Sequence, residues 1–239
     1  MVVPSAVAPL LRELGQIADG LALPAYAVGG CVRDWLLGIK KTADLDVTVE
    51  GNGLILARQA AAALKAELTE HQQFGTATLE LPGKANQRID VSSCRKEAYS
   101  QPAAYPKVTP GALQDDLFRR DFTINAMAVS INRKTFGHCV DPFKGREDLG
   151  KGCLRVLHEG SFSDDPSRIL RGIRFLKRFD LHWDPRTREL TLKAIADGEL
   201  GRLNAGRLAR ELGHMADEPN PKACFNALAE MLDAAIKLS

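Results

Sequence analysis

The spacing of apolar residues predicts a mixture of helices and strands over the first part of the chain. Apolar residues recur at three- and four-residue intervals over residues 5–19 and 54–68, which predicts two amphipathic helices. Apolar and polar residues alternate over residues 74–81, which predicts a half-buried strand. Two shorter runs, at residues 23–28 and 88–91, also predict strands.

The periodic pattern dissolves between residues 92 and 116, where Pro102, Pro106 and Pro110 interrupt it. A connection of this length in a compact domain is generally functional or disordered. We favour a mobile element beside an active site over a tolerated surface insertion, because candidate site residues flank the segment on both sides.

The pattern changes again near residue 152. One further short strand is predicted at residues 153–157, and after it only helical periods remain. The sequence therefore predicts two domains, residues 1–152 and residues 153–239.

Composition narrows the function classes only slightly. The chain has 239 residues and a formal net charge of +2, which is too small to indicate a polyanion partner. Apolar runs long enough for a membrane span are absent from the sequence, as is a signal-peptide pattern. The five cysteines are scattered without a C-x-x-C pair, which argues against a disulfide framework or a zinc site. We expect reduced cysteines and a cytoplasmic protein.

A glycine pair, Gly29 and Gly30, follows the strand predicted at residues 23–28 and precedes a helix. A turn at a helix N-terminus offers free backbone N–H groups to a phosphate, and glycine lets the anion approach closely. Arg33 lies one helical turn further and adds a fork of donors for the same phosphates. The alternative is that the glycine pair forms only a turn.

Two acidic residues, Asp44 and Asp46, lie on one face of the next predicted strand, because side chains alternate along a strand. Their carboxylates, about 7 Å apart along the chain, suit a hard divalent cation such as Mg²⁺. A phosphate cradle beside two carboxylates indicates metal-assisted phosphoryl or nucleotidyl transfer. The alternative is a polar strand face that discourages aggregation.

Two further polar groups leave alternatives open. Asp90, in the strand predicted at residues 88–91, is either a third acid beside the first two or a polar strand end. Residues 119–128 predict a helix that starts with Arg119 and Arg120. Cations oppose the helix dipole there unless an anion, such as a triphosphate, offsets them. The alternative is a solvated basic pair.

A helix rich in arginine is predicted at residues 163–175, where acids and a proline mark its start. An exposed basic face is the simpler interpretation. The sharper one concerns base selection, because the Asp165 carboxylate can accept from an exocyclic amine while Arg168 donates to the adjacent ring nitrogen. That pair would accept CTP and ATP and reject UTP and GTP, at about 1–3 kcal/mol for each wrong bidentate contact.

Five ordered motifs carry a resemblance to a known family. They read G-G-x-V-R-D-x-L-L-G, D-L-D-x-x-x-E-G, R-R-D-F-T-I-N-A-M-A, D-P-F-x-G-x-x-D-L and D-D-P-S-R-I-L-R-G-I-R-F. Over roughly residues 24–215 the chain resembles the bacterial and eukaryotic class of tRNA nucleotidyltransferases, which comprises CCA-adding, CC-adding and A-adding enzymes. Bacterial poly(A) polymerase is a close relative of that class.

The resemblance implies an α+β fold, with a head domain of the DNA polymerase beta type over residues 1–152 and an all-α neck over residues 153–239. It implies Mg²⁺ held by Asp44 and Asp46, and attack of the tRNA 3′-hydroxyl on the α-phosphate of ATP or CTP with release of pyrophosphate. The implied nucleotide-binding residues are Gly29, Gly30, Arg33, Arg120, Asp165, Arg168, Arg171 and Arg174.

The chain departs from the family pattern in places. Asp164 stands where relatives usually have glutamate, and the chain ends at Ser239 where relatives continue into body and tail domains. We therefore expect either the head and neck of a longer enzyme or a naturally short one. Pro110 and Gly111 lie where relatives have a mobile element linked to adding the terminal A, which favours CCA or A addition over CC addition.

Two other functions stay open at this level. One is bacterial poly(A) polymerase activity, although the residues from Thr42 to Asp46 and from Val49 to Gly51 look more like the tRNA enzymes. The other is an inactive module of the same fold that binds nucleotide or RNA, against which the complete pair of Asp44 and Asp46 argues. In all three cases we expect no membrane association, and the oligomeric state is left open.

Overall fold

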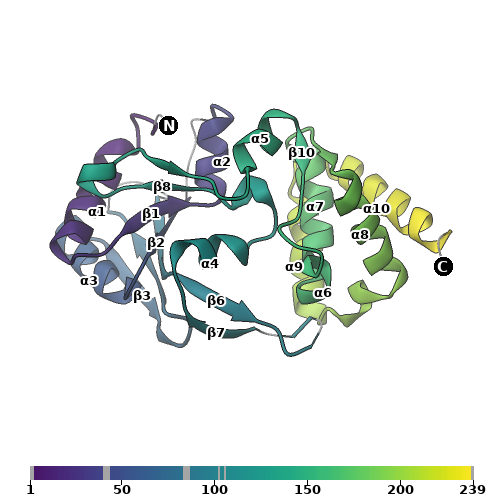
Figure 1. The fold of residues 1–239 in the computed structure, drawn as a ribbon, viewed down its shortest axis with the longest axis horizontal. Helices are drawn as coiled ribbons and strands as arrows, with labels where there is room; N and C mark the ends of the chain where they lie inside the picture. The colour runs from purple at the N-terminus through teal and green to yellow at the C-terminus, as the bar shows by residue number, and fades with distance from the viewer. Residues whose placement is uncertain (1–2, 40–43, 83–86, 102, 105, 238–239) are drawn as a thin grey trace. The chain divides into compact units, whose positions relative to one another are not determined.

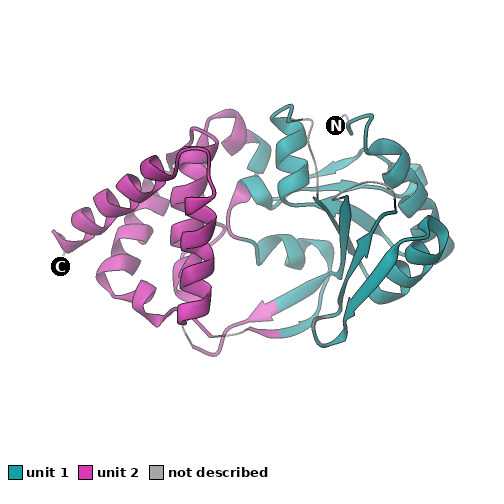
Figure 2. Cartoon of the chain, turned by 180° about the vertical axis from the view of Figure 1, so that it is seen from behind, with its two compact units in different colours: residues 1–96, 108–120, 124–146 teal, residues 97–107, 121–123, 147–239 magenta. Residues whose placement is uncertain are grey.

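The computed structural model describes residues 3–39, 44–82, 87–101, 103–104 and 106–237 (Figure 1). By its internal contacts the chain forms two compact units (Figure 2), residues 1–96, 108–120 and 124–146, and residues 97–107, 121–123 and 147–239. Two short segments before residue 147 thus group with the second unit. The head and neck assignment at residues 152 and 153 stays a prediction. Among the described residues, no helix combines the length and hydropathy needed to cross a membrane.

The first unit is built on a seven-stranded mixed sheet with the strand order β3-β4-β5-β2-β1-β8-β9. β2 and β5 are parallel, and the other neighbouring pairs are antiparallel. Its strands are β1 (Ala25–Val28), β2 (Asp44–Val49), β3 (Glu67–His71), β4 (Thr76–Glu80), β5 (Arg88–Ser93), β8 (Ala128–Ser130) and β9 (Cys139–Val140). This mixed sheet with helices confirms the α+β class.

Helices α1 (Ala8–Gly20) and α3 (Gly53–Leu64) pack against each other and against the sheet. Leu45, Val47 and Val49 of β2 are fully buried in the core that these helices close. Because side chains alternate along β2, Asp44 and Asp46 point to the opposite face, as expected. The core therefore fixes which face of the sheet is acidic.

The helix predicted at residues 54–68 is confirmed over most of its length, but its end is wrong. α3 stops at Leu64, because Lys65 takes a left-handed conformation with φ of +52°. Leu68 instead lies in β3, opposite Leu79 of β4. Its apolar side chain continues the helical spacing by coincidence, and from β3 it packs, partly buried, against the core of the first unit.

The segment expected to lack regular structure is also different. β6 (Arg95–Ala98) and β7 (Lys107–Pro110) form a two-stranded sheet, and α4 (Leu113–Phe118) follows. Pro102 lies outside the described residues. Backbone pairing between the strands, which needs no apolar periodicity, accounts for the order that the residue pattern did not predict.

The helix predicted at residues 119–128 is wrong. Only a single 3₁₀ turn forms at Thr123–Asn125, and β8 begins at Ala128 between β1 and β9. Every residue from Phe122 to Ile131 that carries an apolar side chain is buried. A short, continuously apolar run of this kind does not distinguish a buried helix from a buried strand.

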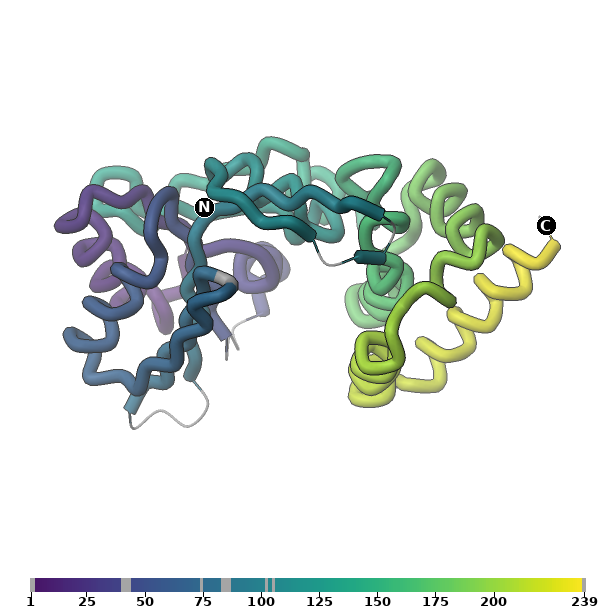
Figure 3. The backbone as a smooth tube through the Cα atoms, turned by 90° about the horizontal axis from the view of Figure 1, so that it is seen from below, coloured from purple at the N-terminus to yellow at the C-terminus, as the bar shows by residue number. Residues whose placement is uncertain are grey.

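The second unit is mostly helical, as expected. Its helices are α6 (Ser161–Asp164), α7 (Ser167–Arg178), α8 (Pro185–Ala196), α9 (Ala205–Ala216) and α10 (Pro221–Ile236), and α5 (Gly145–Gly150) begins at the junction of the units. In Figure 3, α8 to α10 run from green to yellow. Of the strand predicted at residues 153–157, only the first two residues form one, β10 (Cys153–Leu154), which pairs with an unexpected β11 (His182–Trp183).

α7 is the central helix of the second unit. It contacts both α9 and α10, and its residues Ile169 and Ile173 are fully buried. A Cβ at Gly172 would collide with the ring of Trp183 and lie 2.9 Å from Phe122. Glycine at this position therefore lets two aromatic rings pack directly against the helix backbone.

Candidate active site

The glycine pair forms the turn that joins β1 to α2 (Gly30–Leu36). Gly29 has φ of +76°, a conformation that favours glycine, and its N–H donates to the Met127 carbonyl at 3.2 Å. A Cβ at Gly29 would lie 2.5 Å from Arg120 Nη1 and 3.8 Å from Asp46 Oδ2. The turn is therefore in close contact with two of the predicted site residues.

Arg33 is fixed beside this turn by its neighbours. Its guanidinium is buried and donates to Asn125 Oδ1 at 2.6 Å and to Asp34 Oδ1 at 2.7 Å. A Cβ at Gly30 would lie 3.5 Å from Arg33 Nη2, so the guanidinium borders the helix start. Asn125 follows Arg33 by 92 residues, and the sequence alone contains no signal for that contact.

The predicted acids lie on two neighbouring parallel strands. In the register of β2 and β5, Asp46 stands opposite Asp90 and Asp44 stands opposite Arg88. Asp44 is 65% exposed, whereas Asp46 is half-buried. Asp90 accepts from the Thr78 hydroxyl at 2.6 Å and from Arg88 Nη2 at 2.7 Å. Asp90 lies inside β5 (Arg88–Ser93) and is thus part of the acidic face rather than a polar strand end.

Burial raises the pKa of Asp46 above its ordinary value. The nearby guanidinium of Arg120 opposes this shift, while the charges of Asp90 and Asp44 reinforce it. A carboxylate that is desolvated among like charges gains from any cation that enters its surroundings. Burial and the neighbouring acids therefore disfavour the charged form of Asp46 while no further cation is present.

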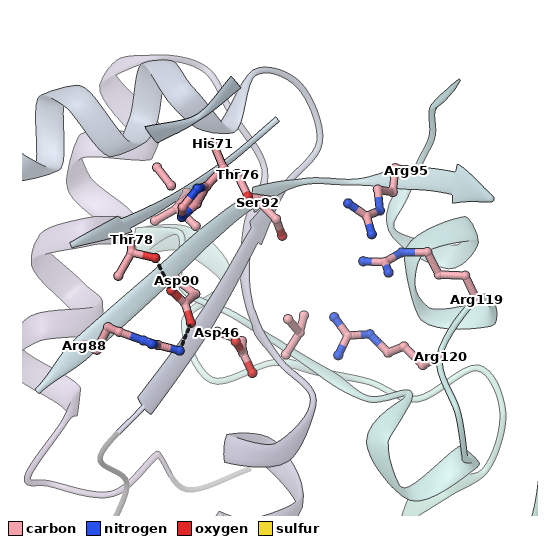
Figure 4. A pocket seen from close by; sticks show the side chains of 13 residues that line it. Asp46, His71, Thr76, Thr78, Arg88, Asp90, Ser92, Arg95, Arg119 and Arg120 are labelled. Carbon is pink, nitrogen blue, oxygen red and sulfur yellow. Dashed lines mark hydrogen bonds and ion pairs between the residues drawn. The ribbon is translucent and has the colours of Figure 1, made fainter. Parts of the chain in front are cut away.

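A cavity of about 500 Å³ opens on this face of the first unit (Figure 4) and is called the Asp46 cavity below. Asp46 and Asp90 line one side, and the guanidinium groups of Arg95, Arg119 and Arg120 point into it from the other side. Acidic groups for a cation and basic groups for phosphates thus face each other across one cavity.

Arg119 and Arg120 follow the end of α4, so their placement at a helix start was wrong. Both pair with Asp116, whose side chain is completely buried, at 2.7 Å for Arg119 Nη2 and 3.1 Å for Arg120 Nη2. Burial alone would raise the pKa of Asp116, but the two guanidinium groups outweigh it and lower that pKa. Asp116 was missed, although its spacing of three and four residues from the arginines indicates the contact.

The chemistry of Asp44 and Asp46 fits a hard divalent cation, because carboxylate oxygens are the ligands that Mg²⁺ prefers. Across the described part of the chain, no three acidic, histidine or cysteine side chains are gathered as a ready metal site. Asp46 lines the Asp46 cavity and Asp44 is not among its lining residues, so metal binding by the two aspartates of β2 stays a prediction.

The two predicted base-reading residues, Asp165 and Arg168, belong to the second unit but do not share a helix. Asp165 lies between α6 and α7 in an extended conformation and accepts from the Ser167 N–H at 2.9 Å. Arg207, 42 residues further along in α9, also donates to its carboxylate. Arg168 is buried and donates to Ser161 Oγ at 2.6 Å. Arg207 was missed, because only the packing of α9 brings it to Asp165.

The other two arginines of α7 are engaged by carboxylates. Arg171 Nη2 lies 2.7 Å from Asp121 Oδ2, and this acid raises the pKa of Arg171. Arg174 Nη1 lies 3.0 Å from Glu218 Oε1, beside a separate cavity of about 350 Å³. Support of the base-reading residues by Arg171 and Arg174 stays a prediction.

The sequence of this chain is similar to a known protein family and to several characterised enzymes. The family described as "Poly A polymerase head domain" matches residues 25–155. An A-adding tRNA nucleotidyltransferase of Halalkalibacterium halodurans is 38% identical over 93% of this chain and 52% of its own length. One of Geobacter sulfurreducens is 41% identical over 91% of this chain and 24% of its own length. A CC-adding tRNA nucleotidyltransferase of Deinococcus radiodurans is 36% identical over 81% of this chain and 50% of its own length.

Solved structures give the same context. One described as "The structure of CCA-adding enzyme apo form II" has a TM-score of 0.89 at 43% identity, over 96% of this chain and 53% of that one. One described as a CCA-adding enzyme complex with ATP has a TM-score of 0.85 at 40% identity, with 96% and 52% coverage. A Thermotoga maritima CCA-adding enzyme complexed with tRNA has a TM-score of 0.82 at 41% identity, again with 96% and 52% coverage. The chain spans about half or less of the length of these proteins.

Proposed function

Because the chain belongs to the family of poly A polymerase head domains, we propose that it is a template-independent tRNA nucleotidyltransferase. It adds CCA, or the terminal A alone, to tRNA 3′ ends from CTP and ATP, and pyrophosphate leaves. The observation that carries this proposal is the Asp46 cavity, where a carboxylate of β2 faces Arg120 beside the Gly29 turn. The relatives named as A-adding and CC-adding enzymes support the same substrate class.

Asp44 and Asp46 would hold divalent metal, for which we propose Mg²⁺. When bound, such an ion activates the attacking hydroxyl and neutralises charge on the leaving phosphates. Proteins of this family generally use divalent metal, and the oxygen donors of the two aspartates suit that requirement. The raised pKa of Asp46 means that its carboxylate becomes available to a cation at a higher pH than an ordinary aspartate does.

The chain's own cations bind and orient the triphosphate. Arg120 and Arg119 enter the Asp46 cavity from the end of α4, where Asp116 holds them. Arg33, which borders Gly30, adds a guanidinium next to the turn. Fixed donors around phosphate oxygens stabilise charge that develops as the α-phosphate is attacked. The buried contacts of Arg33 and Asp116 keep these donors in place before substrate arrives.

The proposed choice of base uses Asp165 and Arg168. Asp165 would accept from the exocyclic amine of cytosine or adenine, and Arg168 would donate to the adjacent ring nitrogen. Ser167 and Arg207 orient the Asp165 carboxylate through their hydrogen bonds. Uracil or guanine would leave buried polar groups unpaired, which costs about 1–3 kcal/mol for a bidentate contact.

The test is incorporation of labelled ATP and CTP by the purified chain. The substrates are tRNA that lacks CCA, tRNA that ends in CC, and an unrelated RNA of equal length. Sequencing of the 3′ ends then distinguishes CCA addition from addition of the terminal A. Short additions confined to tRNA are the expected result.

The controls define the alternatives. Asp46→Asn should abolish incorporation, whereas Asp233→Asn, which changes an exposed acid of α10, should not. Long A tails on any RNA would replace this proposal with poly(A) polymerase activity. Absence of incorporation with all three RNAs, in a chain that still binds ATP, would leave a nucleotide-binding module. A cytoplasmic location, expected for a tRNA-processing enzyme, stays a prediction.

A further inference from the structure

One cation already lies on the acidic face of β2 and β5, and it is a side chain of this protein. Arg88 Nη2 donates to Asp90 Oδ2 at 2.7 Å, and Arg88 Nε lies 3.9 Å from Asp44 Oδ1. The register places Arg88 beside Asp44, while Asp90 stands beside Asp46. The guanidinium of Arg88 therefore lies between Asp44, one predicted metal ligand, and Asp90, the residue beside the other predicted ligand, Asp46.

The position of Arg88 limits what the acids can do while it stays there. Both oxygens of Asp90 are engaged, one by Arg88 and the other by the Thr78 hydroxyl at 2.6 Å. The positive charge of Arg88 also reaches Asp46, because it is among the charges that lower the pKa of that carboxyl. A divalent cation that enters beside Asp44 and Asp46 must then either approach this guanidinium or displace it.

We propose that Arg88 is an internal counter-cation that competes with divalent metal for the acidic face of β2 and β5. In the metal-free protein it balances the charge of Asp44 and Asp90, and it leaves them when the metal binds. The long arginine side chain is half exposed and can swing into solvent without disturbing the core. This inference rests on the proposed metal role of Asp44 and Asp46.

If Arg88 competes with the metal, loss of its charge should increase the affinity for divalent cations. If Arg88 instead supported metal binding, the same change should lower that affinity. Removal of the charge by Arg88→Gln should tighten divalent cation binding, because repulsion disappears and no ligand is lost. Coulomb energies between exposed charges at this range, screened by salt, correspond to about a threefold to tenfold change in affinity. Arg88→Lys keeps the charge but loses the fork to Asp90, so its affinity should lie between the two.

The experiment measures binding of Mn²⁺ alone, from the electron paramagnetic resonance signal of the free ion, to the whole chain without nucleotide. The matched control is Arg58→Gln, because Arg58 has a similar exposure (54% against 49%) and a similar carboxylate partner, Glu70, but lies outside the Asp46 cavity. Asp46→Asn shows which bound Mn²⁺ occupies the predicted site, because that ion should be lost in this variant. Thermal unfolding of every variant verifies that each is folded.

The expected result is tighter binding in Arg88→Gln, with Arg58→Gln at the wild-type affinity. Equal or weaker binding in Arg88→Gln, with an ion that Asp46→Asn removes, would overturn the counter-cation role and leave the metal assignment intact. Binding that Asp46→Asn leaves unchanged would overturn the metal assignment itself, and this inference with it.

Discussion

The completely buried carboxylate of Asp116 holds Arg120 at the wall of the Asp46 cavity, with 3.1 Å between Arg120 Nη2 and Asp116 Oδ2. The Nε of Arg120 is also buried and has no hydrogen-bond partner among the described residues. Asp116 therefore sets the position of a cation that the proposed reaction needs, although it does not itself line the cavity.

We expect Asp116→Asn to lower the free energy of unfolding by about 3 kcal/mol, at the lower end for a broken buried ion pair because its arginines reach solvent. The folded-state pKa of Asp116 lies below its ordinary 3.8. The stabilisation by this carboxylate is therefore present above about pH 4 and is lost as the pH falls through the folded pKa. Urea unfolding at pH 7 and at pH 3 measures both effects.

Asp115→Asn is the matched control for that prediction, because Asp115 is the neighbouring acid of α4 and its side chain is only partly buried. It should cost much less at pH 7. A loss of equal size in both variants would contradict the special role of Asp116.

Asp46→Asn should abolish nucleotide transfer without loss of stability. Burial raises the folded-state pKa of Asp46, so its charged form opposes folding once the pH exceeds the ordinary value of 3.8. The variant should therefore be as stable as the wild type at pH 7, or more stable, and any gain should vanish below about pH 4. Thermal unfolding measured beside the incorporation assay checks both statements. Destabilisation at pH 7 would mean that Asp46 has a structural role.

Gly29→Ala should reduce both stability and triphosphate binding. The added Cβ would lie 2.5 Å from Arg120 Nη1. The alanine would also have to adopt the positive φ of Gly29, which is unfavourable for a residue with a side chain. Gly38→Ala is a close control, since Gly38 has φ of +72° and nothing within 4 Å of the added atom. Gly38→Ala should therefore show only the backbone cost, of order 1 kcal/mol. Titration of ATP and thermal unfolding of the two variants measure the difference, and equal effects would argue against the contact with Arg120.

Asp165→Ala should relax the choice among nucleotides. If the carboxylate reads the exocyclic amine, the preference for ATP over UTP should fall by about tenfold to a hundredfold. Arg207→Gln should reduce the same preference less, because Asp165 keeps its hydrogen bonds from Ser167. Competition between ATP and UTP in the incorporation assay measures both ratios. Arg186→Gln, which changes an exposed arginine paired with Glu159, should leave them unchanged.

The sequence predicted those features that depend on neighbours along the chain. The alternation of Asp44 to Val49 determined the face that Asp46 occupies. Pro166 marked the start of α7, although the helix predicted from residue 163 began four residues too early, because Asp164 belongs to α6 and Asp165 is extended. Contacts between distant segments were beyond reach, because nothing in the local pattern specifies that Asn125 meets Arg33 or that Arg207 meets Asp165. The sequence also did not predict β6 and β7, because their order comes from backbone pairing in a stretch without apolar periodicity.

The way the chain threads its two compact units has a consequence for protein engineering. Asp121–Thr123 belongs to the second unit, although the residues on either side of it in the sequence belong to the first. In the second unit Phe122 packs on Phe175 and Trp183, and Asp121 pairs with Arg171. A fragment that ends at residue 152 would contain Phe122 but not Phe175 and Trp183, which cover its ring. We expect the exposed ring to promote aggregation of that fragment. Chimeras between relatives should therefore exchange these three residues together with α7, wherever else the crossover is placed.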